Sequence, residues 1–322
     1  MTTGIRCLVL STMIMVPLCG LAYKSDPAYS KARRTGAMAQ MKLLISNDKG
    51  EPVHDASIHV LMGMNFRERS YDVDGKSDTN GLFVVEGKTT GNEVIIEVTK
   101  DGYYKSSQKR CFIKMGDEFE VKDGRWQPWG MSIPITLREI RAPVQLVVQK
   151  ELYKIPSTNT LVGFDMALKD WVAPNGKGKH ADFEVFLTWD GKPLYYTQHT
   201  QLEVRFLEKH AGYYVFDNIK GSQFGGPYAA DTNRTFQTDF SCMSSFANGA
   251  PSFRGVDVGK SLIVRSRCKV DNDGRLTSAN YSTIKNITVE AGWTGEVMMM
   301  IRYYFNPIPN DTNLEPKRES AK

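Results

Sequence analysis

Apolar residues in this chain recur at every second position or in short runs, and groups of turn-forming residues separate these segments. In the N-terminal third the segments lie at 41–45, 57–62, 82–85 and 93–98, with turn sequences at 46–50, 78–81 and 101–102. Alternation with a period of two is typical of a strand with one buried face, and no helical period intervenes. The spacing of these strands predicts a β-sandwich domain over residues 40–140.

The rest of the chain shows the same alternation. Strand-like segments lie at 144–149, 183–189, 201–206, 262–268, 278–281 and 296–305, and the turn sequences 190–191 and 271–274 predict hairpins. The stretch 218–258 contains few strand signals and predicts a long loop region. We therefore predict an all-β protein with two β-sandwich domains in tandem. The second is a sandwich or jelly-roll-like domain over 141–307, followed by a polar tail over 308–322.

Part of the first block is similar to a known family. The sequence GEPVHDASIHV from Gly50 to Val60 resembles the opening of a carboxypeptidase regulatory-like domain. The turn and strand at 77–83 and the corner Asp101-Gly102-Tyr103 resemble later parts of that domain. The resemblance covers about residues 40–140 and implies a prealbumin-like or immunoglobulin-like sandwich with no catalytic residues of its own. The remainder resembles only uncharacterised secreted bacterial proteins, which supply no function.

Residues 1–22 have the layout of a secretory signal peptide. Arg6 precedes an apolar stretch over 7–18, and Gly20 and Ala22 supply the small residues of a cleavage site. The stretch is shorter than the roughly 20 residues that cross a bilayer, so we predict no transmembrane span. The alternative to a signal peptide is a buried N-terminal core helix. We expect a secreted, periplasmic or cell-surface protein.

Two features of the N-terminal region refine this expectation. The residues before Cys19, Val16-Pro17-Leu18, are not the small residues that precede a lipidated cysteine, which argues against a lipid anchor at Cys19. Residues 23–39 are polar and predict a tether or a short leading helix outside the core.

Composition excludes several classes of protein. The chain has 322 residues, of which 41% are hydrophobic, and this excludes wholesale disorder. Its formal charge of +5 comes from 41 basic and 36 acidic residues, without the clustered positive charge of a nucleic-acid-binding protein. Cleavage after Ala22 leaves Cys111, Cys242 and Cys268. Cys242 and Cys268 are the candidate disulfide, and three separate buried thiols are the alternative.

No motif for catalysis, metal binding or cofactor binding occurs in the sequence. The five histidines do not form H-E-x-x-H, C-x-x-C is absent, and neither a nucleophile elbow nor a phosphate loop is present. We therefore predict no catalytic residue, no metal and no cofactor.

Two groups of residues are candidates for ligand binding. The glycine-rich stretch from 165 to 182 could bind a sugar, or a metal through His180 and Asp182; its candidate residues are Asp165, Asp170, Trp171, Lys177, His180 and Asp182. The alternative for this stretch is a solvated loop between strands. Trp126 and Trp129 could form an aromatic platform for sugar stacking, or they could pack a domain junction.

Three functions are compatible with these observations. The first is a non-catalytic binding or accessory protein whose ligand is a carbohydrate or a partner protein. The second is a structural component of the cell envelope that assembles through sheet edges. The third is a hydrolase with an unfamiliar site built on residues 165–182 and 218–258.

Overall fold

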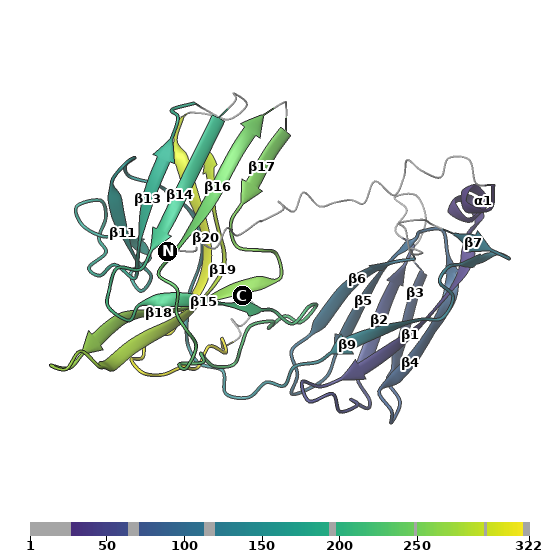
Figure 1. Cartoon of the computed structure of the whole chain (residues 1–322). Helices are drawn as coiled ribbons and strands as arrows, with labels where there is room; N and C mark the ends of the chain where they lie inside the picture. Colours follow the sequence, from purple (N-terminus) through teal and green to yellow (C-terminus); the bar gives the residue numbers. More distant parts are fainter. Residues whose placement is uncertain are drawn as a thin grey trace. The chain divides into compact units, whose positions relative to one another are not determined.

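The computed structural model describes residues 27–63, 71–112, 120–192, 198–247, 250–292 and 295–317. The predicted signal peptide and Cys19 lie outside the described residues. Among the described residues the structure is all-β apart from one helix, and it divides into two compact units (Figure 1). Of the described residues, the N-terminal unit contains those from Pro27 to Arg141 together with Ile219–Gly225, and the C-terminal unit contains those of Ala142–Asn218 and from Gly226 to Lys317.

The N-terminal unit consists of two antiparallel-rich sheets around one core. Its elements are α1 (Pro27–Thr35), β1 (Ala37–Ser46), β2 (Ser57–Met62), β3 (Tyr71–Lys76), β4 (Leu82–Thr89), β5 (Glu93–Thr99), β6 (Ser106–Cys111), β7 (Val121–Lys122), β8 (Arg125–Trp126) and β9 (Met131–Thr136). One sheet has the order β4-β1-β8-β7, with β9 parallel to β1, and the other has the order β3-β2-β5-β6. Alternate residues of β1 are buried, as the period-two pattern predicts.

Of the two alternatives for residues 23–39, a tether or a short leading helix, the structure has a helix at 27–35, but the expectation that the segment lies outside the core is wrong. Residues 27–35 form α1, and β1 begins at Ala37. Ala32, Ala37 and Ala39 are buried in the core of the N-terminal unit. The prediction missed them because charged and polar residues dominate the composition of this segment.

A short segment from the second half of the sequence completes the N-terminal unit. The N–H of Ser107 donates to the carbonyl oxygen of Gly221 (2.7 Å), and the N–H of Gln223 donates to that of Lys105 (2.8 Å). The side chain of Arg138 donates to the carbonyl oxygen of Phe224 (3.1 Å). Residues 219–225 thus pair along the outer edge of β6.

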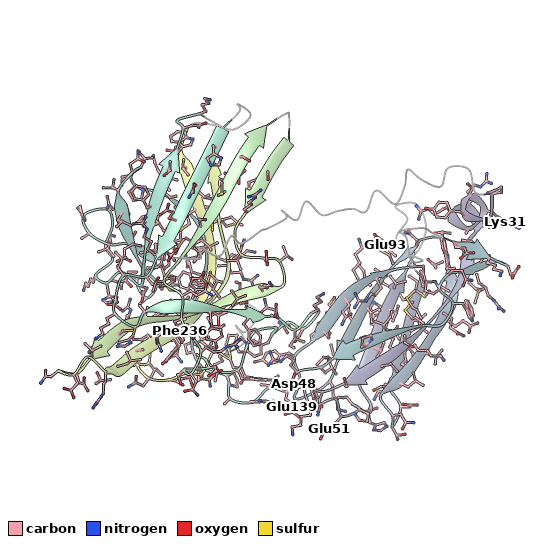
Figure 2. All side chains as sticks on the ribbon, in the orientation of Figure 1. Lys31, Asp48, Glu51, Glu93, Glu139 and Phe236 are labelled. Atoms are coloured by element: carbon pink, nitrogen blue, oxygen red, sulfur yellow. The ribbon has the colours of Figure 1, made fainter. Side chains whose placement is uncertain are left out.

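The C-terminal unit is a sandwich of a five-stranded and a six-stranded sheet. Its strands are β10 (Val147–Lys154), β11 (Leu161–Asp165), β12 (Asp170–Trp171), β13 (Phe183–Trp189), β14 (Gln198–Arg205), β15 (Gly212–Asp217), β16 (Asp239–Ala247), β17 (Ala250–Arg254), β18 (Lys260–Val270), β19 (Leu276–Ala291) and β20 (Val297–Phe305). The sheets have the orders β10-β20-β19-β18-β15 and β12-β11-β13-β14-β16-β17. Side chains fill the space between the sheets (Figure 2). No helix among the described residues is long and apolar enough to cross a membrane.

Two boundaries in the C-terminal unit differ from the prediction. The stretch 218–258, predicted to be mostly loop, contains β16 and β17. The predicted polar tail is wrong for residues 308–317, because Leu314 and Glu315 are buried. The carboxylate of Glu315 accepts a hydrogen bond from the N–H of Ala142 (2.7 Å), so this segment is fastened to the sandwich.

Candidate functional site

Asp165 and Asp182 of the predicted ligand site belong to an internal ion-pair network. Both carboxylates are almost fully buried, and both face the guanidinium group of Arg267. Nη2 of Arg267 lies 2.6 Å from Asp165 Oδ1 and 2.8 Å from Asp182 Oδ2, and its Nε donates to Asp182 Oδ1 (2.9 Å). Each carboxylate oxygen of Asp182 accepts one further hydrogen bond, Oδ1 from Ser266 Oγ and Oδ2 from the N–H of Met166.

The backbone directs Arg267 into this network. The pairing of β18 with β19 shifts register between Ser266 and Lys269, and Arg267 has a φ of 53°. Burial raises the pKa of Asp165, but hydrogen bonds from the N–H groups of Lys179 and Leu168 and the charge of Arg267 outweigh burial and lower it. The two carboxylates are therefore internally satisfied groups with a structural role, and they do not form the predicted ligand site.

The other residues of that predicted site are engaged in separate local contacts. Asp170 accepts hydrogen bonds from the N–H groups of Trp171 (2.8 Å) and Lys177 (2.9 Å), which closes its own turn. Trp171 is buried and its Nε1 donates to the carbonyl oxygen of Lys154 (2.9 Å). Nε2 of His180 lies 2.9 Å from Glu208 Oε1, although its angle is outside hydrogen-bond geometry. Among the described residues no three His, Cys, Asp or Glu side chains converge as a metal site.

The predicted tryptophan platform is not formed. Trp126 is fully buried in the N-terminal unit, where its Nε1 donates to the carbonyl oxygen of Thr89 (3.0 Å). Trp129 is half-buried beneath the guanidinium group of Arg125, 4.7 Å from the ring centroid. Trp126 therefore packs a domain core, and a ligand cannot stack on it.

The candidate disulfide between Cys242 and Cys268 is also not formed in the structure. The thiol of Cys242 donates to the carbonyl oxygen of Ile287 (3.4 Å) in the sandwich core. Cys268 lies within the bulge of β18, and its N–H donates to Glu208 (3.0 Å). The two cysteines thus make separate local contacts and are not bonded to each other.

Glu184 on β13 carries an electrostatic strain that the sequence did not indicate. Burial raises its pKa to about 7, and the nearby negative charge of Glu208 acts in the same direction. Because the pKa is higher in the folded than in the unfolded state, the neutral carboxyl group of Glu184 costs the folded protein nothing below its ordinary pKa of 4.5. As the pH rises through about 7 the buried group ionises, and the folded protein loses stability.

We expect Glu184→Gln to flatten this pH dependence. The variant should match the wild-type protein at pH 4.5 and exceed its stability at pH 8 by about 1–2 kcal/mol, a figure reduced for partial solvent screening. Urea unfolding at a series of pH values measures the difference. Glu151→Gln, at an exposed position of β10, is the control. Parallel pH profiles for Glu184→Gln and the wild-type protein would show that the strain is absent.

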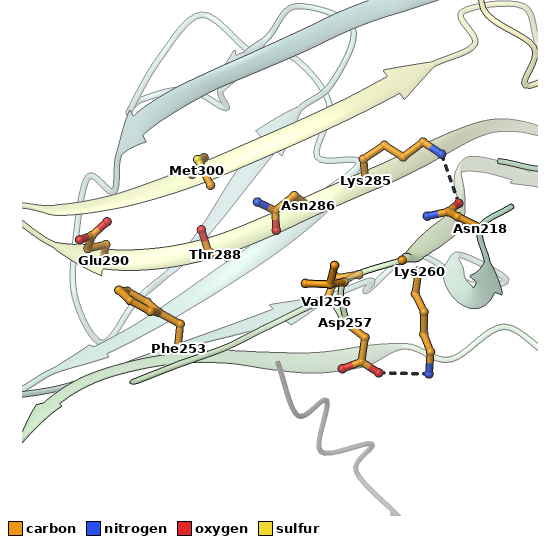
Figure 3. Close-up of a pocket in the computed structure, with 12 residues that line it drawn as sticks. Asn218, Phe253, Val256, Asp257, Lys260, Lys285, Asn286, Thr288, Glu290 and Met300 are labelled. Atoms are coloured by element: carbon orange, nitrogen blue, oxygen red, sulfur yellow. Dashed lines mark hydrogen bonds and ion pairs between the residues drawn. The ribbon is translucent and has the colours of Figure 1, made fainter. Parts of the chain in front are cut away.

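A pocket of about 380 Å³ lies beside β19 in the C-terminal unit (Figure 3). One wall is formed by Asn286, Thr288 and Glu290, which alternate with the buried residues Ile287 and Val289. This volume is toward the lower end of the roughly 300–1,000 Å³ typical of small-molecule sites.

The pairing of the strands creates this space. β18 pairs with β19 as far as Leu262 opposite Ile284. Beyond that point, within the described residues, 286–291 of β19 pair with β20 alone. The end of β17 contributes Phe253 to the pocket, and the chain that follows it contributes Asp257. A register shift between Ile284 and Asn286 makes Lys285 an extra residue, and it also lines the pocket.

The pocket combines polar and apolar groups. Asn218 Oδ1 accepts hydrogen bonds from Ser261 Oγ (2.8 Å) and Lys285 Nζ (3.3 Å). Lys260 and Asp257 form an ion pair at 3.1 Å. Phe253 and Met300 contribute apolar surface (Figure 3). Side-chain amide, hydroxyl and carboxylate groups therefore face an aromatic ring across a hollow.

None of the individually predicted site residues lines this pocket, although Phe253 and Asp257 belong to the stretch 218–258 that the hydrolase alternative included. The sequence does place polar residues at every second position from Asn286 to Glu290. An ordinary strand with one face in solvent shows the same pattern, so it does not predict a pocket. The opposite wall belongs to a stretch that was predicted to be loop. The two walls could be brought together only by knowing where β18 begins.

Comparisons with known proteins do not assign a family. No protein-family model matches the chain, and no curated protein matches it. Among solved structures, 3-chlorocatechol 1,2-dioxygenase from Rhodococcus opacus 1CP is 12% identical over 33% of this chain, with a TM-score of 0.26. Wild-type catechol 1,2-dioxygenase from Acinetobacter radioresistens is 13% identical over 35% of this chain and 55% of its own, with a TM-score of 0.27.

A shaft pilin from Lactobacillus rhamnosus GG is 9% identical over 79% of this chain and 90% of its own, with a TM-score of 0.23. The present chain spans 61% of the length of the chlorocatechol dioxygenase. At these scores the similarities carry no conclusion about function.

Proposed function

We propose that the protein is an exported, non-catalytic carbohydrate-binding protein and that the pocket beside β19 is its binding site. The observation that carries this proposal is the row of Asn286, Thr288 and Glu290 facing Phe253. A sugar ring presents hydroxyl groups around its edge and an apolar C–H face. Amide, hydroxyl and carboxylate groups can pair with the former while an aromatic ring packs against the latter.

The dimensions of the row support an oligosaccharide ligand. Alternate residues of a strand are separated by about 6.7 Å, so the row from Asn286 to Glu290 spans about 13 Å. This length exceeds a single sugar ring, and the exposed side chains of Met300 and Leu152 continue the surface on the neighbouring strands. The resemblance of residues 40–140 to a carboxypeptidase regulatory-like domain, a module without catalytic residues, fits an accessory role for the N-terminal unit.

Phe253→Ala is expected to weaken glycan binding at least tenfold, because it removes the apolar face against which a sugar packs. The measurement is a glycan array of the wild-type protein, followed by titration calorimetry of the strongest ligand with each variant. Leu161→Ala, at an exposed position of β11, should bind as the wild-type protein does. An array without any bound glycan, or equal binding by Phe253→Ala, would contradict the proposal.

A further inference from the structure

Charge is distributed unevenly along the pocket beside β19. At one end Lys285 donates to Asn218 (3.3 Å), and Lys260 is paired with Asp257 (3.1 Å). At the other end Glu290 contributes an exposed carboxylate, and the described part of the chain supplies no ion-pair partner for it. The basic groups of the pocket thus have partners within the protein, whereas Glu290 has no ion-pair partner among the described residues.

The surroundings of Glu290 suit a cation. Figure 3 shows Glu290 and Phe253 at the same end of the pocket, with Lys285 at the opposite end. A carboxylate forms charge-assisted hydrogen bonds with an ammonium group, and an aromatic face attracts the same cation. The two groups together therefore favour a positively charged substituent over a neutral or negative one.

We infer that the ligand is an amine-bearing oligosaccharide whose ammonium group pairs with Glu290 while its ring packs on Phe253. This inference rests on the proposed function and names the sugar class that the site selects. An acidic sugar gains less, because its carboxylate must compete with Asp257 for Lys260 and with Asn218 for Lys285.

Three tetrasaccharides that share one β-1,4-linked glucose backbone test the inference. They carry an amine, an acetamide or a hydroxyl group at the second carbon of each ring, so they differ only at that substituent. The wild-type protein should bind the amine form about tenfold more tightly than the hydroxyl form, and the preference should decrease with added salt. Glu290→Gln should remove the preference while retaining binding of the hydroxyl form.

Glu296→Gln is the matched control, because it removes the same charge from an exposed residue that pairs with Lys154 outside the pocket. Equal binding of the three tetrasaccharides overturns the inference and leaves the proposed function standing. If none of the three, nor any glycan on the array, binds, the proposed function itself is contradicted. A further probe is pentalysine acetylated only at its N-terminus. If it binds at least as tightly as the amine tetrasaccharide and this binding depends on Glu290, the ligand is a peptide and the sugar assignment is overturned.

Discussion

Arg267→Ala is expected to destabilise the C-terminal unit by about 3–5 kcal/mol, because it leaves two buried carboxylates without a counter-charge. The side chains of Asp165 and Asp182 are 1% and 0% exposed, so the guanidinium group takes the place of hydration for both carboxylates. Urea unfolding followed by circular dichroism measures the loss. Arg302→Ala, which removes an exposed guanidinium group from β20, should change stability little.

The same network sets how this unit responds to acid. The pKa of Asp165 is lower in the folded protein, so its contribution to stability is complete above the ordinary pKa of about 3.9 and is lost as the pH falls through the folded value. Arg267→Ala should weaken this acid dependence. The triple variant with Arg267→Met, Asp165→Asn and Asp182→Asn should recover part of the stability, since no unpaired charge stays buried. A loss below about 1 kcal/mol for Arg267→Ala would contradict the structural role of the network.

The strands that the sequence predicted best are those whose inward positions are all apolar. The predicted segment 93–98 corresponds to β5 (Glu93–Thr99), whose buried positions are Val94, Ile96 and Val98. β16 was missed because its core-facing positions include Ser244, which is buried and breaks the apolar alternation. The tail was missed because Leu314 is a single apolar residue among polar ones, and one residue establishes no period.

The interaction partners of the candidate residues could not be predicted from local sequence patterns. Asp165 and Asp182 were recognised as acidic residues of interest, but their partner Arg267 lies 102 and 85 residues further along the chain. Its inward direction depends on a positive φ at a bulge, a position that the sequence of β18 does not mark. The pocket likewise depends on the residue at which β18 begins to pair with β19. Local patterns thus predict which face of a strand is buried, whereas long-range register decides which polar groups meet.

Trp126→Ala is expected to destabilise the N-terminal unit by about 3–5 kcal/mol, the usual loss for a large aromatic residue removed from a core. Its ring stacks on Phe112 with centroids 6.5 Å apart and meets Tyr29 edge-on at 5.9 Å. The residue therefore joins α1 and β8 to the interior of the sandwich, and its removal should also release α1. Thermal unfolding measures the stability, and protease susceptibility near residue 35 reports on the helix.

Two further variants separate packing from hydrogen bonding at this position. Trp126→Phe retains most of the apolar volume but leaves the carbonyl oxygen of Thr89 without its donor, so we expect a smaller loss of about 1–3 kcal/mol. Trp129→Ala, at a half-buried position three residues away, should cost little and leave α1 protected. A loss from Trp126→Ala no greater than that from Trp129→Ala would refute the burial of Trp126. It would also return both tryptophans to consideration as a sugar-stacking platform. The stability measurement therefore also decides whether the N-terminal unit offers an aromatic surface to a ligand or uses Trp126 to hold its helix and two sheets together.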